Sequence, residues 1–390
     1  MAGSSHGEVY ALYDIAMMDE AEVQSIRCIS ERIVSLYDKT APLLRSLDDH
    51  HFMSLGIPEE VLPYIRMQPL PVEGIIRRLD LVKTATSWKH YELNADTPTF
   101  IVETHEMNHY IASEFGARDA NEGCKALLQE AIVKAIYYSH LSEAVPKIVF
   151  TAHESHVEDW NTSKYLGELS GLPHELLSLD RLIVVKDKGL FTPSYEKIDV
   201  LYRQTYPIEH LVHDVSVAGD PVGLELLDLV KAGKLAIINP LSAFLLQSKA
   251  VQAVIWSLHM ENSPYFSAEE HEWIEAYFIP SFLDASSFIE QGKAYVEKPC
   301  FGREGDSIKI YDEHNQLIRS SSVQHVQKSV NMYQEYVELP QCEVKTPDGI
   351  RSGHYLVGSF VIGDEAGAIG IRVGNVITGN ESCFLAVGMR

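Results

Sequence analysis

The sequence contains little cysteine, and the spacing of its cysteines matches no disulfide or metal-binding pattern. The five cysteines are odd in number, widely separated and include no C-x-x-C pair. This usage excludes a disulfide framework and is typical of free thiols in a reducing compartment. No His or basic cluster of the kind that lowers a thiol pKa adjoins them, although Arg303 is near Cys300. We therefore expect none of them to be catalytic: Cys28, Cys124, Cys300, Cys342 and Cys383.

Targeting and membrane segments are also missing from the sequence. The first residues show no basic start followed by an apolar core, so no signal peptide is expected. No apolar run approaches the length that is needed to span a bilayer. We expect a cytoplasmic protein with no membrane partner.

Positive charge is scarce. The chain has 32 basic and 55 acidic residues, and its formal net charge is −23. A nucleic-acid partner needs a basic surface, so this class of function is disfavoured. The balance is compatible with a cationic substrate such as a polyamine, although solubility alone explains most of it. The length of 390 residues suggests two or three domains with a sizeable core.

The common nucleotide-binding signatures are absent too. No G-x-x-x-x-G-K-[ST] occurs, which excludes a P-loop, and the protein-kinase motifs H-R-D and D-F-G are missing. Residues 295–310 instead predict a strand, a glycine loop and a returning strand. Gly302 and Gly305 let backbone amides approach phosphate oxygens, and Lys298 at the strand end adds a positive charge. A short G-x-x-G is equally common in ordinary tight turns.

Residues 75–99 carry the most informative pattern, a predicted hairpin with one polar face. Arg78 and Asp80 share a face of the first strand, and Glu92 and Asn94 share a face of the second. If the polar faces coincide, the oxygens suit a hard cation such as Mg²⁺ and the guanidinium suits a phosphate. The alternative is a solvated face with ordinary salt bridges. The opposite, apolar face is expected to hold Leu79, Leu81, Tyr91 and Leu93.

The remaining elements predict a mixed α/β chain. A short helix should start near Pro58, and Gly171 is a plausible helix C-cap. Helical periodicity covers residues 20–47, 104–114, 121–140, 158–170, 223–231 and 242–259. Strands are predicted at 146–150, 181–186, 198–202, 235–238, 333–340 and 354–362. The helix at 121–140 should turn an apolar stripe to the core, formed by Ala126, Leu127, Ala131, Ile132 and Ala135.

Several of these stretches resemble one known family. Residues 92–99 read E-L-N-A-D-T-P-T and resemble the E-x-N-A-D-T-P-T segment of the glutathionylspermidine synthase family, and residues 78–80 resemble its R-x-D. Further resemblances follow in the expected order: residues 202–207, which read Y-R-Q-T-Y-P and resemble the family's Y-R-x-x-P stretch with one more residue, S-K-A at 248–250 with Trp256, K-P-x-x-G-R-E-G at 298–305, and G-I-R…I-T-x-N at 370–380. The resemblance implies a circularly permuted ATP-grasp-like fold. It also implies an enzyme that joins a carboxylate to an amine through an acyl phosphate.

The resemblance assigns roles to individual residues. It implies that Mg²⁺ is held by Asp80, Glu92 and Asn94. Because Arg78 lies two residues before Asp80 on one strand, its side chain points to the same side, and we expect it to act on the transferred phosphoryl group. ATP is implied as the second cofactor. Its phosphates would be bound by Lys249, Lys298, Arg372 and the loop of Gly302 and Gly305. Its adenine would lie at Gln334 and Glu335, although an ordinary amphipathic strand explains that stretch equally well.

The sequence departs from the family at both ends. The tail at 383–387 lacks the proline-histidine and aromatics of many relatives, so no function is assigned beyond Asn380. Fewer than 80 residues precede Arg78, and Cys28 lacks a papain-like context, so we expect a stand-alone ligase without an amidase domain. Residues 1–145, 146–240 and 241–390 are expected to form an N-terminal part with the hairpin, a substrate-side α/β part and a nucleotide-binding part.

Two alternatives remain open. One is an ATP-dependent ligase with an unrelated acid and amine, and the other is a non-catalytic nucleotide- or polyamine-binding protein. The sequence names neither the acid, the amine nor the oligomeric state.

Overall fold

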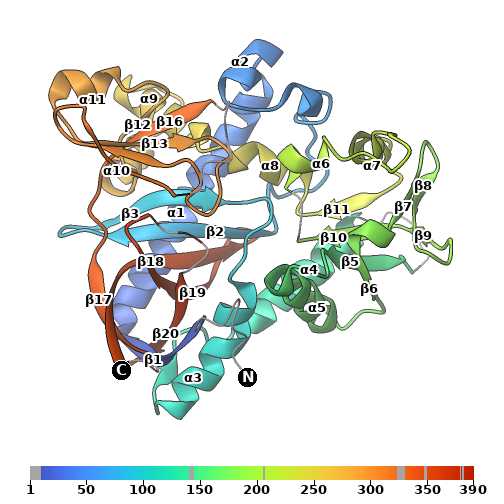
Figure 1. Cartoon of the computed structure of the whole chain (residues 1–390), viewed down its shortest axis with the longest axis horizontal. Helices are drawn as coiled ribbons and strands as arrows, with labels where there is room; N and C mark the ends of the chain where they lie inside the picture. The colour runs from blue at the N-terminus through green and yellow to red at the C-terminus, as the bar shows by residue number, and fades with distance from the viewer. Residues whose placement is uncertain are drawn as a thin grey trace.

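The computed structural model describes residues 10–139, 145–204, 207–322, 330–346, 349–377, 379 and 382–390. Five positions of the stretches named above lie outside these ranges: His140 at the end of a predicted helix, Thr205 and Tyr206 in the stretch 202–207, and Thr378 and Asn380 in the last motif. Within the described residues, the molecule contains a large sheet, a smaller antiparallel sheet, and a separate unit with a parallel sheet, helices and a small three-stranded sheet (Figure 1).

The large sheet joins both ends of the chain. Its order is β1 (Ala11–Met18), β20 (Cys383–Met389), β19 (Glu365–Gly374), β18 (Gly349–Ile362), β2 (Ile76–Lys83) and β3 (Trp88–Asn94). Two strands pair beside this path, β17 (Gln341–Thr346) with β18 and β4 (Arg118–Asp119) with β20. The large sheet therefore combines strands from two of the parts predicted from the sequence, residues 1–145 and residues 241–390.

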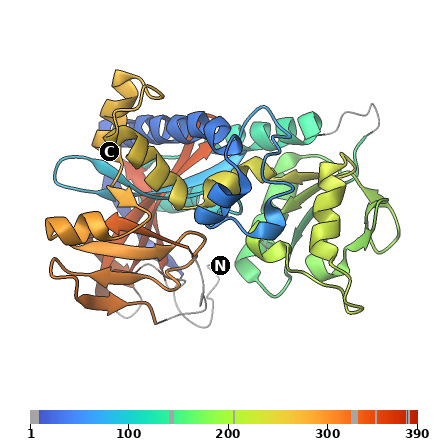
Figure 2. The same ribbon diagram turned by 90° about the horizontal axis from the view of Figure 1, so that it is seen from above.

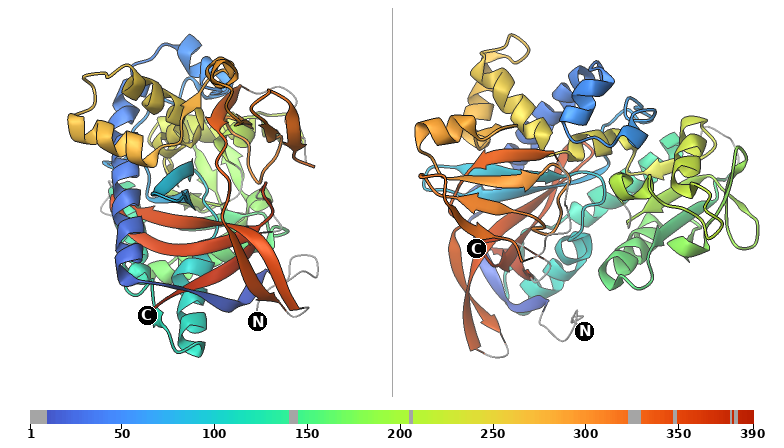
Figure 3. Two further views of the ribbon diagram at one scale, coloured as in Figure 1. Left: turned by 90° about the vertical axis from the view of Figure 1, so that its left-hand side faces the viewer. Right: turned by 45° about the horizontal axis from the view of Figure 1, so that its top comes forward.

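One long helix covers a face of this sheet. Helix α1 (Glu20–Arg45) confirms the prediction for residues 20–47 and contacts β18, β19 and β3 (Figure 3). Its apolar residues recur every three to four positions, so one stripe is buried against the sheet. The opposite face of the sheet is left for the hairpin's polar side chains.

The predicted hairpin is present, with one difference. Strands β2 and β3 pair antiparallel so that Arg78 lies opposite Asn94 and Asp80 opposite Glu92. The register shifts after Asp80, where Leu81 pairs with His90 and leaves Tyr91 as an extra residue. The prediction that Tyr91 faces the apolar side with Leu79, Leu81 and Leu93 was wrong. The bulge turns Tyr91 over, and Tyr91 packs instead against the small apolar cluster that contains Val82 and Leu356.

Short helices lie before and after the hairpin. The first are α2 (Asp49–Ser54) and a single 3₁₀ turn, η1 (Glu59–Val61), where the helix near Pro58 was predicted. The helix predicted at 104–114 starts as a π turn, η2 (Glu103–Met107), and continues as α3 (Asn108–Glu114). Helix α4 (Cys124–Ser139) buries Leu128, Ile132, Ala135 and Ile136. Of the predicted stripe, Leu127 and Ala131 are only half-buried and Ala126 is exposed, so the prediction that Ala126 faces the core was wrong.

The segment from β5 to β11 forms a parallel α/β unit. The sheet order is β11 (Ala236–Ile238), β10 (Val200–Arg203), β5 (Ile148–Ala152) and β6 (Glu175–Ser178). Helix α5 (Val157–Ser170) ends at Gly171, which adopts the left-handed conformation predicted for a C-cap. The unit also contains η3 (Leu179–Arg181), β7 (Ile183–Val185), β8 (Gly189–Phe191), β9 (Lys197–Ile198), α6 (Ile208–Leu211) and α7 (Val222–Lys231). It forms the right-hand lobe in Figure 2.

The helix predicted at 242–259 is broken in two. Helices α8 (Leu241–Gln247) and α9 (Ala250–Met260) meet at 66°. Ser248 adopts an extended backbone, its hydroxyl donates to Leu55 O at 2.7 Å, and Lys249 N donates to Cys300 O at 2.9 Å. Lys249 therefore lies at the start of α9 rather than on the side of a continuous helix, because tertiary partners replace the helical hydrogen bonds at the break.

The smaller antiparallel sheet completes this region. Its order is β12 (Ser281–Phe282), β16 (Asn331–Glu335), β13 (Tyr295–Pro299), β14 (Lys309–Tyr311) and β15 (Leu317–Ser320), beside α10 (Ala268–Tyr277) and α11 (Ser286–Gln291). Strands β13 and β14 pair antiparallel around the glycine loop, as predicted. The strand predicted at 333–340 ends at Glu335.

No single helix in the described ranges is long and apolar enough to cross a bilayer, and only the bent pair α8–α9 passes the criteria of length and composition.

Candidate functional site

The polar face of the hairpin is a network of charged side chains. Asp80 is fully buried and accepts hydrogen bonds from Arg78 Nε at 2.7 Å and Arg78 Nη2 at 3.2 Å. Arg372, which comes from β19, donates from Nη1 to the same carboxylate at 3.1 Å. The third nitrogen of Arg78 donates to Thr99 O at 2.9 Å. Two strands far apart in sequence thus bring two guanidiniums onto one carboxylate.

Two lysines approach from the other elements. Lys249 Nζ lies 3.4 Å from Glu92 Oε2 and donates to Gly302 O at 2.7 Å. The break between α8 and α9 therefore places its ammonium between the hairpin and the glycine loop. Lys298 on β13 is fully buried and lies 3.5 Å above the centre of the Tyr91 ring, a cation–π contact that depends on the bulge.

The charges shift the ionisation of these groups. Burial alone would raise the pKa of Glu92, but the positive charges of Lys249, Lys298 and the two arginines outweigh it and lower the pKa. The pKa of Lys298 is lowered to about 7, mainly by burial and also by the positive charge of Lys249, while the negative charge of Glu92 opposes the shift. Lys298 therefore lacks sufficient negative charge around it.

The sequence-predicted site residues are placed unequally. Gln334 is buried and accepts from Lys298 Nζ at 2.7 Å, so its side chain fixes the lysine. Glu335 pairs with Lys293 at 2.7 Å, and its backbone amide already donates to Pro280 O. Gly302 contributes its carbonyl, and Gly305 adopts a positive φ of 72° that favours glycine. Adenine recognition at Gln334 and Glu335 stays a prediction.

The hairpin offers oxygen donors of the type that Mg²⁺ prefers. Asn94 Nδ2 lies 3.5 Å from Glu92 Oε1, so the carboxamide and the carboxylate adjoin. Hydrogen bonds from arginines occupy three of the four lone-pair directions of the Asp80 carboxylate. The two contacts of Glu92 with described residues, to Lys249 Nζ and Asn94 Nδ2, are longer, at 3.4 Å and 3.5 Å. The donor set therefore fits a hard cation, with Glu92 as its most open member.

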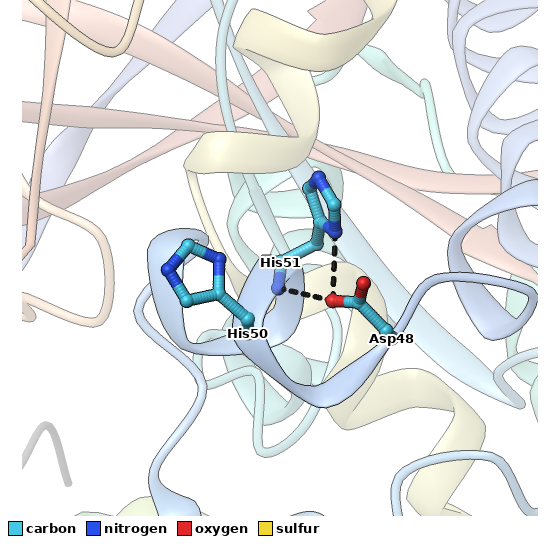
Figure 4. Close-up of side chains that lie close together, drawn as sticks. All are labelled: Asp48, His50 and His51. Carbon is cyan, nitrogen blue, oxygen red and sulfur yellow. Dashed lines mark hydrogen bonds and ion pairs between the residues drawn. The ribbon is translucent and has the colours of Figure 1, made fainter.

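A separate group of exposed side chains lies at α2. Asp48, His50 and His51 lie close together (Figure 4). The Asp48 carboxylate is the N-cap of this helix and accepts from His51 N at 2.9 Å and His51 Nδ1 at 2.7 Å. Because capping already engages this carboxylate, we assign no metal to the group.

Sequence reasoning missed how the A-D-T-P-T segment connects the parts of the molecule. Asp96 forms a buried ion pair with Arg203 at the end of β10. Arg303 of the glycine loop donates to Thr97 Oγ1 at 2.9 Å and to Glu209 Oε1 at 3.3 Å. The motifs flagged each segment separately, but no local signal reports that residues 96, 203 and 303 meet.

A polar hollow of about 470 Å³ opens beside the ends of β5 and β6. Open parallel sheets bind ligands at the carboxyl ends of their strands. The loop after β5 leads on to Glu158 in the first turn of α5, whose pKa is raised by burial although Arg372 and Arg78 oppose the shift. The hollow is lined by His153, Glu154, Ser155, Ser178 and Asp180.

The cysteine nearest to these groups is not activated. Cys300 is buried, and burial raises its pKa to about 11 although Lys249 opposes the shift. Such a thiol is a poor nucleophile at neutral pH. None of the five cysteines, which all lie within the described ranges, forms a disulfide.

Comparison with known proteins decides the family. The model of the family described as glutathionylspermidine synthase preATP-grasp matches residues 2–390. The chain belongs to this family. A Haemophilus influenzae protein named "Putative acid--amine ligase" is 24% identical over 317 residues, which cover 79% of this chain and 72% of that protein. This relative and the family together support a ligase.

The fold matches a solved structure. A glutathione synthetase-like effector (GSS30) from Globodera pallida, in its apo form, superposes with a TM-score of 0.61 at 11% identity. The match covers 98% of this chain and 91% of the effector. At this identity the likeness concerns the fold alone, which is ATP-grasp-like α/β as predicted. Along this chain the hairpin with the candidate metal ligands precedes the glycine loop.

Proposed function

We propose that this protein is an ATP- and Mg²⁺-dependent ligase that joins a glutathione- or peptide-like carboxylate to a polyamine-like amine through an acyl phosphate. One observation carries the proposal. Four basic side chains from four distant parts of the chain converge on the hairpin's two carboxylates: Arg78, Lys249, Lys298 and Arg372. Cations gathered so closely and out of water need a polyanion, and a nucleotide polyphosphate supplies one.

The chemistry follows from these charges. Glu92, Asn94 and Asp80 would hold Mg²⁺, which neutralises phosphate charge when it is bound. The lysines would bind the nucleotide phosphates, and Lys249 would also hold the glycine loop through Gly302. The planar fork of Arg78 matches oxygens of both the transferred phosphoryl group and the attacking carboxylate. Catalysis would come mainly from positioning and electrostatic stabilisation, as in other phosphoryl transfers.

The test is a turnover screen of the purified protein against a matrix of acids and amines. ADP release that depends on both partners, together with a new amide product, supports the ligase. Turnover with an acid and an amine unlike glutathione and spermidine would keep the ligase and replace its substrates. Nucleotide binding without turnover for any pair would favour a non-catalytic binding protein.

A variant tests the metal assignment in the same assay. Glu92→Gln keeps the shape of the side chain and removes its charge, so Mg²⁺-dependent nucleotide affinity and turnover should both fall by at least tenfold. Glu290→Gln, at an exposed position on α11, is the matched control and should change neither. Unchanged affinity and turnover in Glu92→Gln would remove Glu92 from the metal site.

A further inference from the structure

Glu103 is a buried carboxyl group that the site described above does not use. It begins the π turn η2, directly after the A-D-T-P-T segment, and is only 5% exposed. Its Oε2 has no hydrogen-bond partner among the residues that the structure describes. A buried acceptor without a partner is costly, which points to a ligand that supplies the missing donor.

Two glycines bring this turn onto the polar face of the large sheet. A Cβ atom at Gly370 would lie 2.7 Å from Thr104 Cγ2 and 2.9 Å from the Phe100 ring. A Cβ atom at Gly358, which pairs with Asp80, would lie 3.3 Å from Arg78 Cδ. The start of η2 therefore packs on the face that carries Arg78, two residues along β19 from Arg372.

The groups around Glu103 come from three elements and from Tyr10, just before β1. Glu158 on α5 and Arg78 on β2 act on the charge of Glu103, and the Tyr10 hydroxyl faces both acids: it is a hydrogen-bond partner of Glu103 and lies 3.5 Å from Glu158 Oε1. Arg372 on β19 acts on Tyr10 and Glu158. Burial and the neighbouring Glu158 raise the pKa of Glu103 to about 7, while Arg78 opposes the shift. The guanidiniums of Arg78 and Arg372 thus share Asp80 as a hydrogen-bonded partner, and the carboxyl groups of Glu103 and Glu158 are their further neighbours.

We infer that Glu103 is a further catalytic residue, which binds the incoming ammonium group of the amine and accepts its proton; the inference rests on the ligase function proposed above. Arg78 would hold the acyl phosphate, so an amine beside Glu103 lies next to the carbon that it attacks. The partnerless Oε2 is the acceptor that an ammonium donor would satisfy.

The proton transfer balances as follows. An ammonium R–NH₃⁺ gives one proton to the Glu103 carboxylate and becomes R–NH₂. Its lone pair forms the C–N bond with the acyl carbon, the bond from that carbon to the phosphate oxygen breaks, and the leaving phosphate takes the second proton. Glu103 then releases its proton to water. An alkylammonium ionises near the lysine value of about 10.4, so a base poised near neutral pH is needed to free its lone pair.

The experiment compares two amines in one assay. Wild-type protein and Glu103→Gln are supplied with ATP, Mg²⁺ and the acid from the screen, with either spermidine or hydroxylamine as the amine. Hydroxylamine is unprotonated at neutral pH and needs no base before it attacks. Glu103→Gln should lower spermidine-dependent turnover by about 10²-fold or more and leave hydroxylamine-dependent ADP release within about twofold. Glu106→Gln, on the same turn but paired with Lys125, is the matched control and should affect neither amine.

The remaining outcomes overturn the inference. An equal fall with both amines makes Glu103 structural, and no fall with either removes it from the reaction. Wild type that releases no ADP with any acid and either amine rejects the ligase function itself, and the inference with it. If Glu103→Gln lowers the melting temperature of the protein, Glu103→Asp replaces it as the test variant. It keeps the negative charge but moves the carboxylate away from the amine, and spermidine-dependent turnover must again fall while hydroxylamine-dependent ADP release does not. The pH profile gives a second readout: spermidine turnover of the wild type should level off above about pH 7, whereas that of Glu103→Gln should keep rising with pH.

Discussion

Arg78 is the residue whose role is most divided between structure and chemistry. Its fork already holds Asp80 with two nitrogens and Thr99 O with the third. In the proposed reaction the same fork meets the transferred phosphoryl group, where charge is redistributed during transfer. A donor placed there stabilises the transition state more than resting ATP. Structure and catalysis therefore make different predictions for one substitution.

Arg78→Lys keeps the charge and loses the fork. We expect turnover to fall by about 10²- to 10³-fold with ATP affinity within a few-fold of wild type. Steady-state kinetics and a melting curve on the same sample check this, with Arg319→Lys at an exposed position on β15 as the control. If the variant is merely less stable and its folded fraction turns over normally, Arg78 only holds the hairpin together.

His105 predicts a pH dependence of stability. It is buried in η2, its Nδ1 lies 3.1 Å from Ile101 O, and its Nε2 has no partner among the described residues. Burial lowers its pKa to about 4, although the bond to Ile101 opposes the shift. The folded state therefore keeps His105 neutral where the unfolded chain takes up a proton, near pH 6.5. Its contribution is fully present above pH 6.5 and is lost as the pH falls toward 4.

The measurement is urea unfolding between pH 8 and pH 5. His105→Phe removes the titrating group, so the fall in unfolding free energy from pH 7 to pH 5 should be smaller than in wild type by about 2 kcal/mol. The exposed His50→Gln should leave the wild-type dependence unchanged. Parallel pH profiles for wild type and His105→Phe would show that His105 does not stay neutral in the fold.

At the scale of elements, the sequence predicted local structure well and its tertiary interruptions poorly. The pairing of β2 with β3, the alternation along β2 and the cap at Gly171 rest on local signals, and these predictions were confirmed. The break at Ser248 depends on Leu55 and Cys300, which lie far away in the sequence. The bulge that turns over Tyr91 depends on a pairing register that the apolar pattern does not fix. The apolar run at 242–259 therefore read as one helix.

The same limit applies to the site. The family motifs named Asp80, Glu92, Lys249, Lys298 and Arg372, and the structure brings these five close together. Glu103 carries no motif signal of its own, since a glutamate at the start of a helix is ordinary. Its significance lies in burial and in the nearness of Glu158, which only the folded chain reveals.

The glycine loop is held in position by two side chains, Lys249 through Gly302 and Arg303. The Arg303 side chain connects the loop to Thr97, just after the hairpin, and to Glu209 on α6. In Arg303→Gln we expect faster amide hydrogen exchange in residues 300–308 and more ATP hydrolysis without amide formation, because a loosened loop admits water to the acyl phosphate. Arg319→Gln is the exposed control. Unchanged exchange in this segment would mean that Lys249 alone, through Gly302, holds the loop.

At the scale of the whole molecule, the large sheet and the parallel α/β unit must be held in one arrangement for the site to form. The sequence predicted the α/β layer but not what joins it to the hairpin. Asn239, just after β11, performs this task and is only 2% exposed. Its Oδ1 accepts from Ile75 N at 3.0 Å and Ile76 N at 3.1 Å. Its Nδ2 donates to the carbonyls of Ile76, Ala95 and Asp96 at 2.9, 3.0 and 3.1 Å.

Asn239→Ala removes all these bonds at once and leaves buried amides and carbonyls without partners. We expect a loss of about 3 kcal/mol or more in unfolding free energy, since each unsatisfied buried group costs about 1–3 kcal/mol. The partners stand at the start of β2 and just beyond β3, the strands that carry Asp80 and Glu92, so nucleotide affinity of the remaining folded protein should fall as well. Urea unfolding and a nucleotide titration measure both effects, with the exposed Asn161→Ala as the control. A stability loss below 1 kcal/mol would mean that water or backbone shifts replace these bonds. A large loss with unchanged nucleotide affinity would mean that the hairpin keeps its register without the α/β unit.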